Sequence, residues 1–265
     1  MLLARQELSQ VFKKFTQSSG WLLIFCLLVV TFSIFPQKSS SRQNFDNLEN
    51  AYRANNRGVS LLEQFKSDEA EKEFRKALSF KPDLKLAQIN LVIALFNSKK
   101  LDEAKTLANK FLETEMNSPQ AFYILGLIAR SENKTDEALT NFRKVLAIDA
   151  KDVGTNVNLG QLLSQKRDYA EAIKVLQTAY ETEPFNLTAI YNLATSLQRS
   201  GERERAAELL KKFQVLRDTF AGVNIGLNYL EQGIYAEASA SKGLENELVD
   251  KNEPKVNFTN TTLNI

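Results

Sequence analysis

The chain has 265 residues, of which 43% are hydrophobic and 25% are charged, a composition typical of folded globular proteins. Its 34 lysines and arginines against 32 aspartates and glutamates leave a net charge of +2, which gives no reason to expect nucleic acid as a partner. The chain contains no histidine and a single cysteine, Cys26. This excludes Ser-His-Asp and Cys-His catalytic systems, histidine- or cysteine-based zinc sites and an internal disulfide.

The first predicted element is an apolar segment near the amino terminus. No charged residue lies between Lys14 and Lys38, a stretch long enough to cross a bilayer as a helix. We expect a transmembrane signal anchor over residues 20–36, a cytoplasmic tail over residues 1–19 and export of the remainder, because cations slightly favour the amino-terminal side. A cleaved signal peptide is the alternative, but the stretch that precedes the apolar segment is long for one.

After a polar linker, residues 37–50, the sequence repeats with a period of 34. The frames are residues 51–84, 85–118, 119–152, 153–186 and 187–218. Position 8 of the frames is small except in the second frame: Gly58, Val92, Gly126, Gly160 and Ala194. Position 20 is always alanine: Ala70, Ala104, Ala138, Ala172 and Ala206. Apolar residues at helical spacing around these positions predict two helices in each frame, and the frames must stack to bury their apolar faces.

This pattern resembles the tetratricopeptide repeat family. Asn158-Leu-Gly160 followed by Asp168-Tyr-Ala-Glu-Ala172 is close to the usual sequence of that repeat. The resemblance covers residues 51–240 and implies an all-α fold, a right-handed solenoid of five repeats. A partial sixth repeat is expected over residues 219–240, where Gly233-Ile-Tyr-Ala-Glu-Ala238 recurs.

The same resemblance places positions 2, 5, 9, 12 and 13 of each frame on a concave face. These positions are apolar and aromatic in the amino-terminal half and polar in the carboxy-terminal half. The candidate residues for binding a protein or peptide partner are Tyr52, Val59, Leu62, Leu86, Ile89, Ile93, Phe96, Tyr123, Leu127, Arg130 and Tyr191. An exposed apolar strip of this kind usually marks an interaction site. Two alternatives stay open: the chain's own linker or tail covers the strip, or its residues belong to the core.

Motifs of enzymes are absent from the sequence. It has no glycine-rich phosphate loop and no GxSxG motif. Acidic pairs such as Asp102-Glu103 and Asp136-Glu137 lie where second helices begin, a position that suits the helix dipole. We therefore expect no catalysis, no cofactor, no metal, no nucleic acid and no small-molecule substrate.

The carboxy-terminal residues 241–265 lose the helical pattern, and Val256 and Phe258 favour a strand. The region from Asn228 to Thr259 is similar to bacterial exported proteins in which tetratricopeptide repeats precede an FG-GAP propeller with an ASPIC-type region. This similarity implies a bacterial inner-membrane protein with extracytoplasmic repeats. The favoured function is a membrane-tethered, non-catalytic adaptor. The alternative is an amino-terminal structural or docking module of a larger exported propeller protein, with residues 241–265 beginning an absent β domain.

Overall fold

The computed structural model describes residues 40–242, with side chains from residue 43 onward. The chain divides into two compact units, Met1–Asp46 and Asn47–Ile265. Of the first unit, residues 40–46 are described, and every contact below lies in the second unit. The predicted anchor, residues 20–36, and most of the predicted tail lie outside the described residues. Within residues 40–242, none of the helices has the length and apolar character needed to cross a bilayer.

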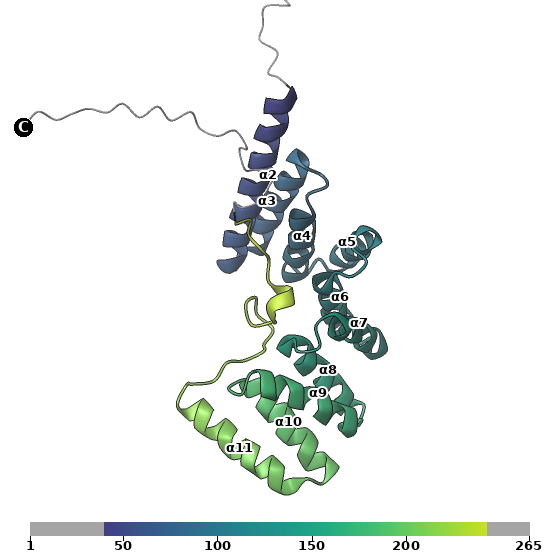
Figure 1. The fold of residues 1–265 in the computed structure, drawn as a ribbon, viewed down its shortest axis with the longest axis vertical. Coiled ribbons are helices and arrows are strands. Elements are labelled where there is room, and N and C mark those ends of the chain that lie inside the picture. Colours follow the sequence, from purple (N-terminus) through teal and green to yellow (C-terminus); the bar gives the residue numbers. More distant parts are fainter. Residues whose placement is uncertain (1–39, 243–265) are drawn as a thin grey trace, which may run out of the picture. The chain divides into compact units, whose positions relative to one another are not determined.

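In the described residues, ten α-helices form five consecutive pairs (Figure 1), one pair in each 34-residue frame. They are α2 (Ser40–Glu63) with α3 (Ser67–Phe80), α4 (Lys85–Asn97) with α5 (Leu101–Thr114), α6 (Pro119–Ser131) with α7 (Thr135–Ile148), α8 (Val153–Gln165) with α9 (Tyr169–Thr182), and α10 (Leu187–Ser200) with α11 (Arg203–Asp218). Each helix of the stack packs against its neighbours in sequence, and first helices such as α4 and α6 also contact one another.

The turn inside every pair contains one residue in the left-handed region, always at position 15 of the frame. These residues are Phe65, Lys99, Asn133, Arg167 and Gly201, with φ between 60° and 99°. A left-handed residue ends the first helix sharply and directs the chain back along it. Only the last of the five is glycine. Asparagine, as at Asn133, also adopts this region, whereas Phe65, Lys99 and Arg167 are residue types that it disfavours.

Within each pair, positions 8 and 24 of the frame fit together by size. At Gly58 an added Cβ would lie 2.5 Å from the Phe74 ring, and at Gly126 it would lie 2.6 Å from the Phe142 ring. The second frame, which departs from glycine with Val92, carries the small Ala108 at position 24. A large residue at one position thus goes with a small residue at the other, which keeps the packing close in each pair.

Two expectations about the ends of the repeats were wrong. Residues 37–50 are not simply a linker, because α2 already begins at Ser40. Residues 219–240 do not form a partial sixth repeat. After α11 the chain runs without α-helix as far as Lys242, and its regular element is a 3-10 turn, η1 (Ile234–Ala236). The backbone excludes a helix here, since Leu230 and Gly233 both have positive φ.

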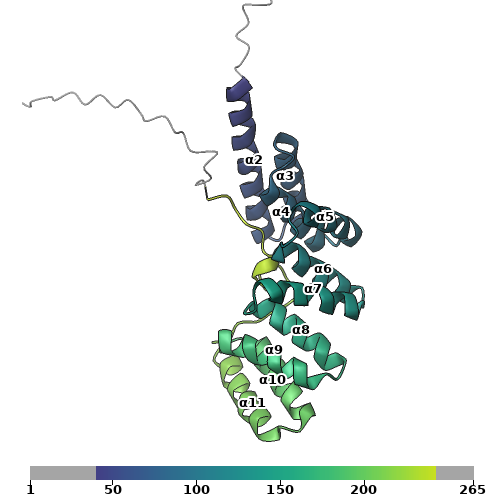
Figure 2. The same ribbon diagram turned by 45° about the vertical axis from the view of Figure 1, so that its right-hand side comes forward.

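We call residues 219–242 the strap. From the end of α11 the strap turns back past α8 and α6 and reaches α2, opposite in direction to the order of the repeats (Figures 1 and 2). The strap therefore returns along the repeats instead of extending them.

Candidate functional site beneath the strap

The candidate site is the face formed by the first helix of each pair, α2, α4, α6, α8 and α10, which we call the first-helix face. At its α10 end the strap pairs with the backbone as a short extended segment. Leu187 N donates to Val223 O at 2.8 Å, and Val223 N donates to Phe185 O at 3.1 Å. The Thr188 hydroxyl accepts from Ile225 N at 2.9 Å and donates to Ile225 O at 3.1 Å. The contact is thus made to the main chain of the strap.

At the opposite end, asparagines of α4 and α2 hold the strap in the same two-way manner. Asn90 Nδ2 donates to Ser239 O at 2.8 Å, and Asn90 Oδ1 accepts from Ser239 N at 2.9 Å. Asn56 makes the corresponding pair of bonds with Ser241, at 3.1 and 2.8 Å. Asn55, fully buried, accepts from Asn90 Nδ2 at 2.8 Å and so fixes the orientation of that amide. A side-chain amide satisfies both main-chain groups of one strap residue in each case.

Tyr123 of α6 lies at the centre of the face. Its hydroxyl donates to Gln232 O and accepts from Asn158 Nδ2, the latter at 3.0 Å. Burial raises the pKa of Tyr123, which therefore stays protonated and able to donate. Next to this hydroxyl, the backbones of Gly154 and Gly233 lie so close that a Cβ on either would meet Tyr123 or the other glycine within 3.2 Å.

The strap also buries side chains of its own around the centre. Tyr229 and Ala236 are buried and belong to the main apolar core of the repeats. The Tyr229 hydroxyl accepts from Ala238 N at 2.9 Å, which closes this part of the strap into a compact turn. The Tyr235 hydroxyl donates to Asp149 Oδ2 at 2.9 Å, and its ring packs on Tyr123. Side-chain packing thus anchors the centre of the strap. Main-chain hydrogen bonds hold its two ends, and at the α10 end Ile225 also packs on a small apolar cluster.

Most residues that the sequence placed on an open apolar strip are buried. The buried ones are Tyr52, Val59, Leu62, Ile89, Ile93, Phe96 and Tyr123. Three others are half-buried: Leu86, Leu127 and Arg130. Tyr191 is 50% exposed and packs against Phe213. Both open alternatives therefore apply, since Leu62 and Ile93 are fully buried in the core cluster and Tyr123 lies beneath the strap.

Arg130 of α6, which is half-buried, lies beside Tyr123 at the centre of the face. Its guanidinium bonds to Asn158 Oδ1, so Asn158 links Arg130 to the Tyr123 hydroxyl. Burial lowers the pKa of Arg130 from its ordinary value. Arg130 thus orients the amide that supports Tyr123.

Of the residues that hold the strap, Tyr123 was among the predicted binding residues, whereas Asn56, Asn90 and Thr188 were not. Four of the five frames carry asparagine at position 6, namely Asn56, Asn90, Asn158 and Asn192. A polar residue that recurs on an otherwise apolar first helix is a signal that could have identified them. Of these four, Asn56 and Asn90 hydrogen-bond directly to the strap, and Asn158 hydrogen-bonds to Tyr123, which contacts the strap.

Near its α10 end the strap turns large apolar side chains toward water. Phe220 is 94% exposed and Leu227 is 75% exposed, and Val223, Leu230 and Ile234 are also exposed. Val223, Leu230 and Ile234 line a cleft of about 490 Å³ beside α8 and α10. The half of the face that the sequence suggested to be polar is thus made apolar by the strap.

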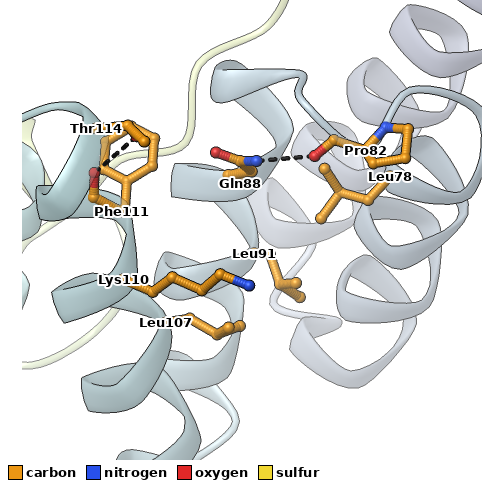
Figure 3. Close-up of a pocket in the computed structure, with 8 residues that line it drawn as sticks. All are labelled: Leu78, Pro82, Gln88, Leu91, Leu107, Lys110, Phe111 and Thr114. Carbon is orange, nitrogen blue, oxygen red and sulfur yellow. Dashed lines mark hydrogen bonds between the residues drawn. The ribbon is translucent and has the colours of Figure 1, made fainter.

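Two further features lie away from the first-helix face. A smaller cleft of about 230 Å³ opens between α3, α4 and α5, with Leu78, Leu91, Leu107 and Phe111 on its walls (Figure 3). On its wall, Gln88 Nε2 donates to Pro82 O at 2.8 Å, a hydrogen bond that joins α4 to the turn before it. We find no arrangement of polar groups in it that converges on a ligand.

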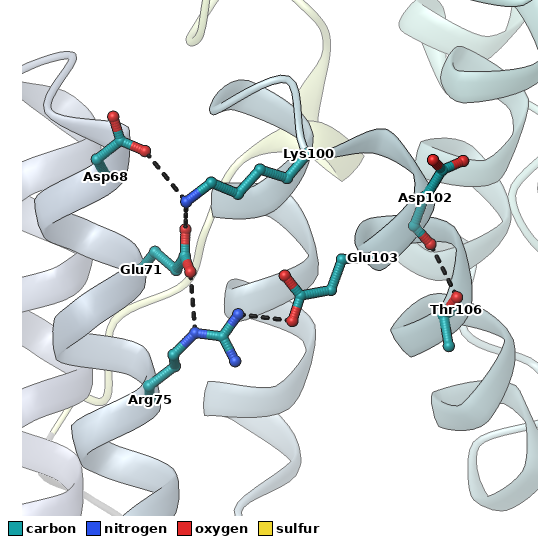
Figure 4. A network of polar contacts seen from close by, with 7 residues as sticks. All are labelled: Asp68, Glu71, Arg75, Lys100, Asp102, Glu103 and Thr106. Atoms are coloured by element: carbon teal, nitrogen blue, oxygen red, sulfur yellow. Dashed lines mark hydrogen bonds and ion pairs between the residues drawn. The ribbon is translucent and has the colours of Figure 1, made fainter.

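An ion-pair network ties α3 to the next pair (Figure 4). Glu71 accepts from Lys100 at 2.7 Å and from Arg75 at 2.9 Å, and Arg75 also reaches Glu103 at 2.7 Å. Burial alone would raise the pKa of Glu71, but the hydrogen bonds from Lys100 and Arg75 hold it below its ordinary value. This network is structural, since it joins neighbouring repeats. Among residues 40–242 no cluster of acidic or cysteine side chains is arranged to hold a metal ion.

Comparison with known families supports the repeat assignment. Family models described as Tetratricopeptide repeat match residues 51–84, 89–153, 129–178 and 163–213. Among curated proteins, the chain is 27% identical over 204 residues to the human protein O-mannosyl-transferase TMTC3, covering 75% of this chain and 21% of that protein. It is 25% identical over 159 residues to the auxiliary subunit NAA15 of the Arabidopsis thaliana N-terminal acetyltransferase A complex, covering 58% and 18%. The chain thus spans about a fifth of each of these relatives.

Solved structures show the same fold. MamA from Desulfovibrio magneticus RS-1 matches with a TM-score of 0.56 at 20% identity, covering 64% of this chain and 96% of that one. YrrB, described as a TPR protein with an unusual peptide-binding site, matches with a TM-score of 0.50 at 23% identity, covering 63% and 87%. The predicted repeats are confirmed: the chain is a tetratricopeptide repeat protein, and its described helices form the solenoid of that family.

Proposed function

We propose that this protein is a non-catalytic scaffold that binds an extended segment of a partner protein on its first-helix face. The observation that carries the proposal is the two-way hydrogen bonding of Asn56, Asn90 and Thr188 to single strap residues. Such contacts can form with any extended chain, because every residue except proline offers the same main-chain donor and acceptor. The peptide-binding description of YrrB, a protein of the same fold, is consistent with this role.

The apolar anchors would add affinity to this main-chain recognition. Tyr123 and the helix surfaces around it enclose Tyr229 and Ala236 of the strap, and both side chains are buried there. Burial of one aromatic side chain contributes on the order of 1.5–3 kcal/mol, more than one exposed hydrogen bond. A partner segment that places an aromatic residue at this point would therefore be selected over one that only matches the main-chain contacts.

The test compares asparagines on two faces of the full chain in its native membranes. All chains in this test carry Gly233→Ala, which frees the face from the strap, because a Cβ at Gly233 would lie 2.8 Å from the Tyr123 hydroxyl. The double variant Asn56→Ala/Asn90→Ala then removes two hydrogen-bonding residues from the first-helix face. Its control is Asn109→Ala, which removes an exposed asparagine on α5 that bonds only within its own helix. Proteins cross-linked to the Gly233→Ala parent chain and the control, but lost from the double variant at equal helicity, support the proposal. Equal recovery from all three chains contradicts it.

Membrane tethering is the second part of the proposal and rests on the sequence of residues 20–36. A tether at a bacterial inner membrane, with the repeats on its extracytoplasmic side, would raise the effective concentration of the scaffold toward membrane-bound partners. Carbonate washing should leave the protein in the membrane fraction, and release of a shortened soluble product would contradict the anchor.

The intact mass of the native product distinguishes the adaptor from the alternative role, a docking module of a larger propeller protein. A mass near 30.0 kDa fits the adaptor. A much larger mass favours the docking module.

A further inference from the structure

We propose that the strap is a built-in ligand of the first-helix face, and that the partner is a protein segment of the strap's own pattern, which replaces it. This inference rests on the proposed function and specifies the partner. The pattern is a glycine at the position of Gly233, a tyrosine four residues before it (Tyr229), and Tyr-Ala two and three residues after it (Tyr235, Ala236). The partner segment would run opposite to the order of the repeats, as the strap does.

The path of the strap is that of a bound peptide and not of a capping element. It contacts α10 through Val223 and Ile225, α6 and α8 through Gln232 and Gly233, and α4 and α2 through Ser239 and Ser241. It therefore touches all five first helices. A solenoid cap would instead cover the apolar face of the last helix pair.

Glycine is required at the centre of the pattern. Gly233 has φ of 101°, which residues with a Cβ rarely adopt, and an added Cβ would lie 2.8 Å from the Tyr123 hydroxyl and 3.2 Å from Gly154 Cα. Gly154 provides the matching space from the other side, where a Cβ would lie 2.7 Å from the same hydroxyl. Because Tyr123 is fully buried and bonded to Asn158, it has little room to move. The face thus discriminates at this point against any other residue.

The strap is also suited to exchange. It has no α-helix, and apart from its centre and Ile225 it is held by hydrogen bonds to main-chain groups that water can replace. Its exposed apolar residues, such as Phe220 and Leu227, gain nothing from its present position. A partner segment with the same anchors can make the same contacts, and it competes with the strap at the effective concentration that the covalent connection gives.

The experiment measures binding of a fluorescent synthetic peptide, residues 219–242, to the full chain in detergent micelles. The releasing variant is Gly233→Ala, and its matched control is Gly201→Ala. Both glycines have φ near 100°, but a Cβ at Gly201 has no atom within 4 Å. Strap release is followed by endoproteinase Glu-C cleavage at Glu237, and helicity by circular dichroism. Tyr229→Ser is a second releasing variant should Gly233→Ala lose helicity.

We expect the peptide to bind the releasing variant about tenfold or more tightly than the wild type and the Gly201→Ala control, because the internal competitor is gone. A peptide carrying Gly233→Ala should fail to bind. A peptide carrying Leu227→Ser should bind normally, since Leu227 is exposed.

Two results would overturn the inference and leave the proposed function standing. One is Glu-C cleavage of the wild type as fast as of the releasing variant, because the strap would then not occupy the face. The other is a released strap with no gain in peptide affinity, because the face would then not recognise this pattern. The proposed function fails separately, if Asn56→Ala/Asn90→Ala in the Gly233→Ala chain, where the strap no longer competes, keeps its cross-linked partners.

Discussion

The helix pairs and the strap are stabilised by different interactions. Between the helices, large side chains such as Phe74, Phe142 and Leu176 are fully buried against small residues of the facing helix. The strap places only a few side chains in the core, and it leaves Phe220 and Leu227 in water. Buried apolar area resists local opening, whereas exposed main-chain hydrogen bonds do not. The repeats are therefore expected to be the permanent scaffold and the strap its exchangeable part.

The largest effect is expected from disturbing the packing of a repeat. Gly126→Val places methyl groups against the Phe142 ring, where even a Cβ would lie 2.6 Å away. We expect the free energy of unfolding to fall by about 3 kcal/mol, the upper range for overpacking a core. Urea denaturation followed by circular dichroism measures this loss of unfolding free energy. The sequence of the strap is unchanged in the variant.

The second frame of the chain provides a built-in rescue for this variant. Its pair is Val92 with Ala108, so Gly126→Val/Phe142→Ala reproduces a combination that the protein already uses. We expect the double variant to be more stable than the sum of the two single changes predicts. Strictly additive losses would contradict the size matching of positions 8 and 24.

These helix pairs are also the part of the molecule that the sequence predicts well. Position 8 and the alanine at position 20 repeat at a fixed period, and the small residue at position 8 faces the side chain at position 24 of the same frame, so both partners are visible in the sequence. Residues 40–50 lack that apolar pattern, so the early start of α2 could not be seen. In the strap, Gly233-Ile-Tyr-Ala-Glu-Ala238 resembles the start of a second helix in sequence, and this led to the wrong prediction of a sixth repeat. No first helix precedes it for such a helix to pack on.

The candidate residues were chosen by their position in the frame, and the structure buries most of them. Residues such as Leu62 and Ile93 were identified by their place in the frame, yet that place does not distinguish an exposed side chain from one beneath another segment. The carboxy-terminal end of the strap is recognised through its main chain, at Ser239 and Ser241. Main-chain recognition leaves no trace in the side chains of the recognised segment. Substituting Ile93 by aspartate would accordingly disturb the core and not test binding.

A smaller effect on the repeats is expected from Glu71→Gln. The hydrogen bonds from Lys100 and Arg75 outweigh burial and hold the pKa of Glu71 below 4.5. A lowered pKa stabilises the fold above the ordinary value, and this contribution is lost as the pH falls through the lowered one. We expect the variant to lose about 1–2 kcal/mol at neutral pH and to show a flatter acid dependence of the unfolding free energy.

The control for that variant is Glu113→Gln, since Glu113 is exposed on α5. It should keep both the stability and the acid dependence of the wild type. An unchanged acid slope for Glu71→Gln would show that the network does not contribute through this carboxylate.

The smallest effect concerns the strap and comes from Tyr235→Phe. Burial and the hydrogen bond to Asp149 raise the pKa of Tyr235 to about 12. The protonated tyrosine therefore stabilises strap docking below pH 10, its ordinary value, and this contribution is lost as the pH rises through about 12. The difference in tyrosinate absorbance between the wild type and the variant should have its midpoint near the higher value. At neutral pH the variant should weaken docking by about 1 kcal/mol and leave the repeats unchanged.

The most direct test of the account is residue-resolved hydrogen exchange of the full chain, read at the amides of Ser239 and Ser241. Both amides donate to asparagines of the first-helix face, Asn90 and Asn56. If the strap occupies that face, both exchange more slowly than free peptide amides, though faster than amides inside α6 and α7, and added partner segment releases them. Exchange at the free-peptide rate in the unliganded protein would contradict the account.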